Sequence, residues 1–191
     1  MADLTLSQPE RRNLLLPIGI AIVILAAATA LLLALSPYRT PGFTITRTAA
    51  WQAHTVFKSD SIVVGQDAAQ DDLYVLLTLR IDDRLKIPLF LKDFTATLTT
   101  ADGQLLETSA TEKSDLEPLY ATFPGLKALA SPPLLREATI EPGQSAEGML
   151  LLHFPATKDT WEHRKAATLT VDLYHQGPQT IPIPAEALAA K

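Results

Sequence analysis

The sequence predicts an all-β sandwich with one short inserted helix, preceded by a single N-terminal transmembrane helix. Three observations support this class: a long charge-free apolar run near the N-terminus, period-two alternation of apolar and polar residues after it, and turn dipeptides between the alternating segments. The expected parts are a cytoplasmic tail, a transmembrane helix, a linker, a sandwich and a C-terminal tail. They cover residues 1–12, 13–36, 37–42, 43–184 and 185–191.

The apolar run extends from Leu14 to Leu35, and no charged residue lies between Arg12 and Arg39. At about 1.5 Å per residue, a helix over this run reaches about 33 Å, which matches a hydrocarbon core of roughly 30 Å. The run is longer than the apolar part of a cleaved signal peptide, so an uncleaved anchor is the favoured interpretation. The expected lipid-facing residues include Leu14, Ile22, Leu25 and Leu33.

The flanking charges set the expected orientation. Arg11 and Arg12 precede the run and only Arg39 and Arg47 follow closely, which favours an N-terminus inside and a C-terminal domain outside the cytoplasm. The expected location is therefore the inner (plasma) membrane, with a single pass. Small residues at Ala26, Ala30 and Ala34 form one stripe that would let a second helix pack closely.

Beyond the linker, alternating segments predict about eight half-buried strands. The clearest are FTITRT, LYVLLTLRI, FTATLTT, QLLET, GMLLLHF, ATLTVDLY and TIPI, with further strands expected at Ile62–Val64 and Leu134–Ile140. Many short strands separated by turns favour a sandwich over a parallel α/β sheet.

Turn and cap signals complete the prediction. Asp102-Gly103 is the pair preferred where both central residues of a hairpin turn need φ > 0. A short helix is expected from Ser114 or Asp115 to Phe123, capped by a Ser114–Glu117 capping box and stopped at Pro124-Gly125. It is expected to pack across one end or edge of the sandwich.

Composition excludes several functions. The chain has 191 residues, a net charge of −5 and no cysteine, so disulfides and thiolate metal sites are absent. No basic block interleaved with aromatic residues is present, which argues against nucleic-acid binding.

Ser145 lies in PGQSAEG, which approaches the G-x-S-x-G pattern of a hydrolase nucleophile. The second glycine is one position late and a strand pattern follows in place of a helix. Pro142-Gly143 instead fits the centre of a type II turn. The sequence therefore predicts no catalytic residue.

The segments FTATLTTADGQLLE, IEPGQSAEGMLLLHFP and ATLTVDLY resemble the Ig-like sandwich domains of bacterial exported and membrane-anchored proteins, of the immunoprotective extracellular type. Asp102-Gly103 and Pro142-Gly143 carry the similarity, which covers roughly residues 43–184. The chain departs from the pattern in having DDRLKIP where an Asn-rich turn is usual, and in a long insertion at 109–134. The resemblance implies an Ig-like fold and an exported location, but no reaction.

Ion and metal sites have few candidates. Asp67, Asp71 and Asp72 crowd one expected loop, which makes them calcium candidates, although solvated aspartates at strand ends are the simpler interpretation. No two of the four histidines stand two or four residues apart, so no metal site or cofactor is predicted. The histidines are His54, His153, His163 and His175.

Aromatic residues offer candidate partner contacts at Trp51, Trp161, Tyr120 and Phe123, with packing in the core as the competing role. The expected function is that of a membrane-anchored, extracytoplasmic Ig-like interaction module, an accessory or assembly subunit of a membrane complex. The expected partners are membrane lipid and other membrane or periplasmic proteins. The alternative is a calcium- or ligand-binding sensor that uses the acidic end loops.

Overall fold

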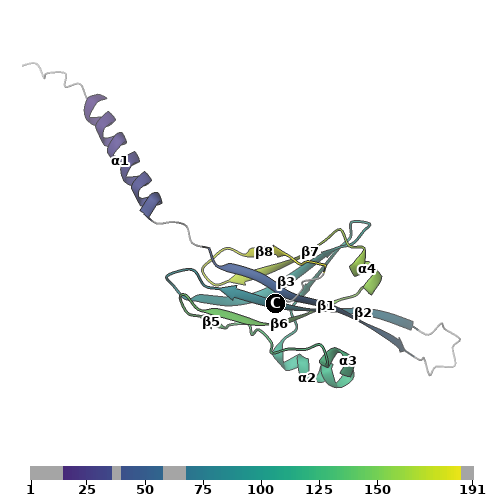
Figure 1. Ribbon diagram of the computed structural model, residues 1–191. Coiled ribbons are helices and arrows are strands. Elements are labelled where there is room, and N and C mark those ends of the chain that lie inside the picture. The colour runs from purple at the N-terminus through teal and green to yellow at the C-terminus, as the bar shows by residue number, and fades with distance from the viewer. Residues whose placement is uncertain (1–14, 36–39, 58–67, 186–191) are drawn as a thin grey trace, which may run out of the picture. The chain divides into compact units, whose positions relative to one another are not determined.

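The computed structural model describes residues 15–35, 40–57 and 68–185, and it divides into two units after Arg39 (Figure 1). The expected strand at Ile62–Val64, the calcium candidate Asp67 and the anchor residue Leu14 lie outside these ranges. Each unit is described by itself below.

The first unit contains the helix α1 (Leu15–Leu35), whose side chains are described from residue 16 to residue 32 and are all exposed. Ile22 and Leu25 are 62% and 70% exposed. Within the described ranges, no helix reaches the length and apolarity needed to cross a membrane. The predicted span at residues 13–36 is therefore not confirmed. The side chains of Leu33 and Ala34 lie outside the description.

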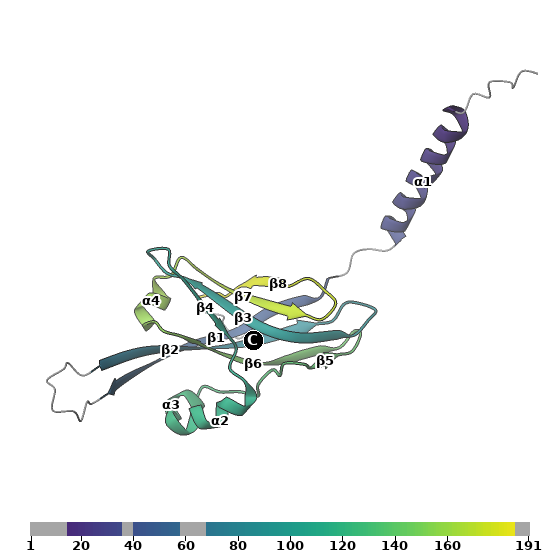
Figure 2. The ribbon, with the colours of Figure 1, turned by 180° about the vertical axis from the view of Figure 1, so that it is seen from behind.

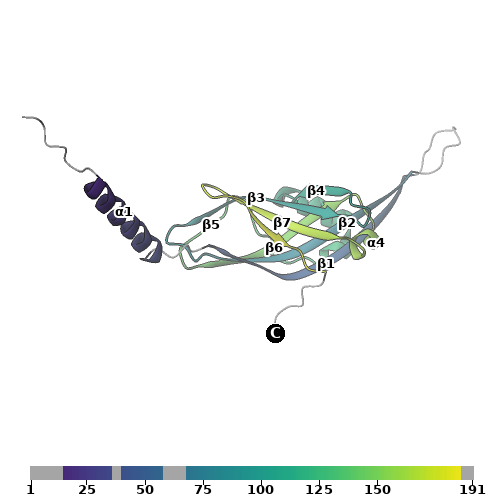
Figure 3. The same cartoon turned by 90° about the horizontal axis from the view of Figure 1, so that it is seen from above.

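The second unit is mostly β, with two antiparallel sheets and a few short helices (Figures 1 and 3). One sheet has the order β1-β2-β6, and the other has the order β4-β3-β7-β8 with β5 also paired to β3. The strands are β1 (Gly42–Phe57), β2 (Ala68–Asp82), β3 (Leu89–Thr99), β4 (Leu105–Ser109), β5 (Thr139–Ile140), β6 (Ser145–Phe154), β7 (Ala166–Leu173) and β8 (Gln179–Pro182).

The period-two pattern produces the core between these sheets. Alternate residues of β2, β3 and β7 point to one face, and a buried inner cluster forms from them together with residues of β6. Phe94 and Phe154 are its largest fully buried side chains. The alternation that the sequence shows at these strands is thus confirmed as the basis of the core.

A second apolar layer covers the outer face of the β1-β2-β6 sheet. The helices α2 (Lys113–Thr122) and α3 (Pro124–Lys127) lie together on that side of the domain (Figure 2). Their residues Leu116, Tyr120 and Leu126 join Tyr74 and Leu151 of the sheet in a cluster that we name the outer cluster. Its remaining buried members are Ala53, Leu76 and Met149. The inserted helix thus covers a sheet face, where an end or an edge was expected.

The predicted helix cap is wrong. The helix α2 begins one residue before Ser114, with Glu112 at its N-cap and no side chain capping it. The hydroxyl of Ser114 instead donates to Asp115 Oδ1 (3.0 Å). The expected stop at Pro124-Gly125 does end α2, but Pro124 then opens α3 at a position where proline is well tolerated. A third short helix in this unit, α4 (Lys158–Glu162), is capped by Thr157.

The turns are confirmed in part. Gly143 has φ = +76° and Gln144 N–H donates to Glu141 O (2.9 Å), so Pro142-Gly143 forms the tight turn that leads into β6. At Asp102-Gly103, only Gly103 has positive φ (+94°), so the expected turn with two such residues is wrong. Gly103 N–H donates to Thr100 O (3.0 Å) and Thr100 N–H to Gln104 O (2.9 Å). This pattern fits a type I turn followed by a left-handed glycine.

The segment that precedes β5 also differs from its prediction. A strand is expected from Leu134 to Ile140, but only Thr139–Ile140 is strand. Leu134 instead crosses the edge of β6, where its N–H donates to Met149 O (2.9 Å). Glu137 then adopts a left-handed φ of +59°, which interrupts an extended strand.

Candidate functional site

The edges of the two sheets are where a β domain offers unpaired backbone groups to other chains. The outer edge of β6 is closed by the segments that cross it. Thr111 N–H donates to Leu151 O (2.8 Å), and Met149 N–H donates to Pro132 O (2.8 Å). With the bond from Leu134, these contacts leave little of β6 open to another strand.

The edges of the other sheet are short and protected by their residues. The strand β4 has five residues and carries Glu107 in its middle. The strand β8 has four residues and ends in Pro182, which cannot donate to a ladder. Charge, proline and short length are the usual means by which an edge avoids pairing with another chain.

The outer edge of β1 differs from the other three. This strand has sixteen residues and pairs only with β2 in the part of the chain that the structure describes. A β-bulge between Ile45 and Arg47 interrupts its first part. From Thr48 to Phe57 it contains no Lys, Arg, Asp, Glu or Pro. Over this stretch it is therefore the long edge of this fold without a charged or proline residue, although the start of the helix α4 contacts it, where Lys158 N–H donates to Gln52 Oε1 (2.8 Å).

The aromatic residues beside this edge pack against one another. The ring centroid of Trp51 lies 6.0 Å from that of Tyr74 and 5.4 Å from that of Phe123. A Cβ built on Gly125 would lie 3.3 Å from Trp51 Nε1, so α3 closely approaches the indole ring. Trp51 and Phe123 are partly buried against the outer cluster. These two residues, predicted as partner contacts, therefore expose little side-chain surface to a partner protein.

The two other aromatic candidates are buried. Tyr120 is 9% exposed in the outer cluster, and burial raises the pKa of its hydroxyl, with a further increase from Glu117. Among the described residues its hydroxyl has no hydrogen-bond partner. Trp161 is 3% exposed in the inner cluster. For both residues the structure favours the packing role over the partner contact.

The acidic candidates lie in β2, where a loop was expected. Asp71 and Asp72 are successive strand residues, so they point to opposite faces of the sheet. Asp71 Oδ1 lies 2.8 Å from His54 Nδ1 and accepts from Gln52 Nε2 (3.0 Å). The two carboxylates therefore do not share one ion site.

The other carboxylate has its own histidine. Asp72 Oδ1 lies 2.7 Å from His153 Nε2 and accepts from Gln70 Nε2 (3.0 Å). The His153 ring stacks on Tyr74 with centroids 4.9 Å apart. Desolvation by burial, with a smaller contribution from Asp72, raises the pKa of the Tyr74 hydroxyl.

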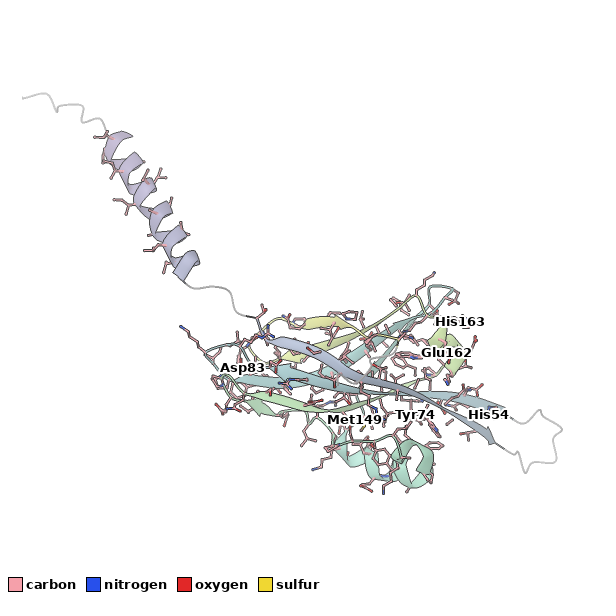
Figure 4. All side chains as sticks on the ribbon, in the orientation of Figure 1. His54, Tyr74, Asp83, Met149, Glu162 and His163 are labelled. Carbon is pink, nitrogen blue, oxygen red and sulfur yellow. The ribbon has the colours of Figure 1, made fainter. Side chains whose placement is uncertain are left out.

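These two histidine–aspartate pairs were missed in the sequence because their members are 17 and 81 residues apart. The hairpin register places His54 directly opposite Asp71, and Tyr74 opposite His153. Strand register was thus the only signal that would have found them. The described residues include no group of three His, Cys, Asp or Glu side chains positioned to hold a metal ion. Figure 4 shows His54 near the end of β1 and the start of β2, and Tyr74 with Met149 on the side of α2 and α3.

A measurable consequence concerns the carboxyl group of Asp71. The hydrogen bonds from His54, first, and from Gln52 lower its pKa. Replacing His54 by alanine is expected to raise that pKa toward the ordinary value, as followed by an NMR titration of the Asp71 carboxyl carbon. Because a lowered folded-state pKa stabilises the fold only above the unfolded-state pKa, the pair's contribution is lost as the pH falls through the folded value.

His153→Ala is the matched control for this titration, since it removes a histidine from Asp72 and leaves the partners of Asp71 in place. If His54→Ala left the Asp71 pKa unchanged, the pair would not exist in solution.

Residues 132–134 cross the edge of β6, and we name them the crossing segment. A cavity of about 550 Å³ lies beside this segment, between the start of β3, the start of α2 and β6. Arg136 on its wall is held by three groups. Its Nη1 donates to Glu112 Oε1 (3.1 Å) and its Nη2 donates to Ala110 O (2.5 Å). Its Nε lies 2.9 Å from Asp93 Oδ1 but is not oriented to form a hydrogen bond with it. Arg136 therefore ties the insertion to the sheets, a role that the sequence did not indicate.

The serine considered as a nucleophile begins β6 and is exposed. His54, His153 and His163 are paired with Asp71, Asp72 and Asp159 respectively. The predicted turn before Ser145 and the predicted strand after it are confirmed.

The fold and the edge together define a mostly β domain of two antiparallel sheets, with one long edge strand that pairs on one side only within the described residues. No protein-family model matches the chain, and no curated protein matches it.

Among solved structures, the yjhA protein from Bacillus subtilis is 14% identical over 69% of this chain and 73% of that chain, with a TM-score of 0.39. A functionally unknown protein from Listeria monocytogenes EGD-e is 12% identical over 79% of this chain and 81% of that chain, with a TM-score of 0.43. These are distant likenesses.

Proposed function

We propose that this chain is a membrane-anchored, extracytoplasmic interaction module with an Ig-like sandwich, and that it binds partner proteins through the outer edge of β1. The module serves as an accessory or assembly subunit for other membrane or extracytoplasmic proteins. The proposal assigns no catalytic step and no cofactor.

The observation that carries the proposal is the contrast between β1 and the other sheet edges. The edges of β4, β6 and β8 are short, charged, closed by proline or crossed by another segment, whereas β1 offers ten successive residues, 48–57, without charge or proline. An exposed edge of this kind accepts an extended segment by main-chain hydrogen bonding, with specificity supplied by the alternating side chains. The partner is therefore expected to present an extended strand.

The anchor is proposed from the sequence of α1. No helix within the described ranges is long and apolar enough to cross a membrane, but the sequence has no charged residue between Arg12 and Arg39, and its 22 residues from Leu14 to Leu35 would reach about 33 Å as one helix. A bilayer core of roughly 30 Å would accommodate this length. The Ig-like assignment likewise depends on the sequence resemblance, and the two antiparallel sheets support it.

The sensor alternative is not favoured by any observation. Asp71 and Asp72 face opposite sides of β2, and each already has a histidine and a glutamine as partners. A calcium ion would have to break these contacts to recruit both carboxylates.

The edge is tested by a charge placed on it. Ala49 lies opposite Leu76 on the outer face of the sheet and is partly exposed, so Ala49→Lys puts an ammonium group beside the edge without filling the core. We expect the variant to fold normally but to lose the proteins that co-purify with the full chain from membranes, as measured by quantitative mass spectrometry. An alkaline wash of the membranes, applied first, also tests the anchor, because release of the chain by that wash would contradict it.

The control is Ala49→Ser, which keeps a small neutral side chain at the same position and is expected to keep those proteins. If Ala49→Lys and Ala49→Ser retained the same proteins at equal thermal stability, the β1 edge would not be the binding surface.

A further inference from the structure

We propose that the strand placed on the β1 edge belongs to a second copy of this chain, with the two β1 strands antiparallel and centred on Ala50. This inference rests on the proposed function, because it names the partner of the same edge. The result is a continuous six-stranded sheet built from the β1-β2-β6 sheets of two copies.

The symmetry of such a pair limits its register. A two-fold axis perpendicular to the sheet places a residue of β1 opposite its own equivalent, and side chains that face each other lie on the same side. The pairing ends at the bulge, since Thr46 is the extra residue between Ile45 and Arg47. With Ala50 at the centre, the paired run is Arg47–Ala53 in both copies, and each bulge falls just beyond it.

The packing around β1 selects Ala50 as the centre. If the two-fold axis passed through Trp51, two indole rings would face each other, although each ring already packs on Tyr74, Phe123 and the backbone at Gly125. A centre at Gln52 would oppose two side chains that already bond to Asp71 and to Lys158 N–H. A centre at Ala50 opposes two methyl groups.

The remaining pairs in this register are also compatible. Ala49 faces Trp51 of the second copy, so a small side chain lies opposite a large one. Thr48 faces Gln52 and Arg47 faces Ala53 of the second copy, so no two like charges meet. The sequence of this strand thus fits its own antiparallel image.

The size of the contact predicts where the pair forms. Seven residues on each side are fewer than the roughly 20–30 residues per side of a standard stable interface, so the pairing is weak for freely diffusing chains. Attachment of both copies to one bilayer raises their effective concentration and favours the pair. The dimer is therefore expected in membranes and not in dilute detergent.

Disulfide trapping tests the register directly, since the chain has no cysteine of its own. Full-length Ala50→Cys is reconstituted in vesicles of neutral and anionic phospholipid and treated with a mild oxidant. Opposite residues at the centre meet the Cα separation of about 4.4–6.8 Å that a disulfide requires, so we expect crosslinking about tenfold faster than for off-centre positions. The off-centre controls are Thr44→Cys, which is exposed, and Thr55→Cys, which is partly exposed.

A second pair of variants checks that the crosslink depends on the edge. Ala49→Lys added to Ala50→Cys is expected to remove the crosslink, and Ala49→Ser added to it is expected to keep it. Equal crosslinking of Ala50→Cys, Thr44→Cys and Thr55→Cys would indicate random collision and would overturn the proposal.

The outcomes separate this inference from the proposed function. If Ala50→Cys fails to crosslink while Ala49→Lys still removes co-purifying proteins, the edge binds other proteins and the second copy is excluded. If Ala50→Cys crosslinks and co-purifying proteins do not respond to Ala49→Lys, the edge serves self-association alone.

Discussion

Replacing Trp161 by alanine is expected to lower the free energy of unfolding by about 3–5 kcal/mol, which is the range for a fully packed aromatic residue. The side chain of Trp161 is 3% exposed and lies in the inner cluster between the sheets. The guanidinium of Arg164 stands 3.7 Å from the centre of the indole ring, and its Nη1 donates to Trp161 O (2.5 Å). Removing the ring therefore opens a cavity and also leaves Arg164 without its stacking surface.

Burial lowers the pKa of Arg164, as expected where desolvation disfavours the charged form. The guanidinium is thus partly removed from water, and the aromatic face replaces some of the lost hydration.

Chemical denaturation of the wild type and the variant measures this loss. Trp161→Phe serves as the control, because it keeps an aromatic ring and is expected to cost less. If Trp161→Ala were as stable as the wild type but lost a binding partner, the residue would be a surface contact and the core assignment would be wrong.

Gly148→Ala is expected to destabilise the domain by about 1–3 kcal/mol or more, the range for overpacking. A Cβ at this position would lie 2.6 Å from Leu134 N and 2.7 Å from Leu134 Cα. These are backbone atoms of the crossing segment, so no flexible side chain can yield. The bonds that join Leu134 and Pro132 to Met149 would have to lengthen.

Gly177→Ala is the matched control, since a Cβ there meets nothing within 4 Å. Thermal unfolding of both variants compares their melting temperatures. Hydrogen exchange at the Leu134 and Met149 amides measures the local effect. Equal melting temperatures for the two variants would show that the crossing segment does not lie against β6 in solution.

The sequence predicted the strands best where one face alone is buried. Alternation in β3 and β7 is clear because their other face is only partly covered, as the burial pattern of these strands shows. The sheet β1-β2-β6 is covered on both faces, by the inner cluster and by the outer cluster. Its residues are apolar in succession, as in MLLL of β6, or lack a clear period, as in AAWQA of β1. Periodicity therefore found only the first third of β1.

The crossing segment and the candidate site could not be derived from local sequence. Leu134 and its neighbours have strand-like composition, but their partner is the edge of β6, fifteen residues further along the chain (Leu134 to Met149). Whether the edge of a sheet is open likewise depends on segments distant in the sequence, because such segments cover the other edges. The β1 edge became recognisable only after β4, β6 and β8 were seen to be closed.

The insertion between β4 and β5 leaves one sheet, spreads α2 and α3 over the far face of the other, and returns to the first sheet. It wraps around the β6 side of the domain. Separating the two sheets on that side would require the insertion to detach, which would expose Leu116, Tyr120 and Leu126 to water. In the proposed complex, a force that a partner exerts on β1 would act on a domain whose opposite side this insertion holds closed.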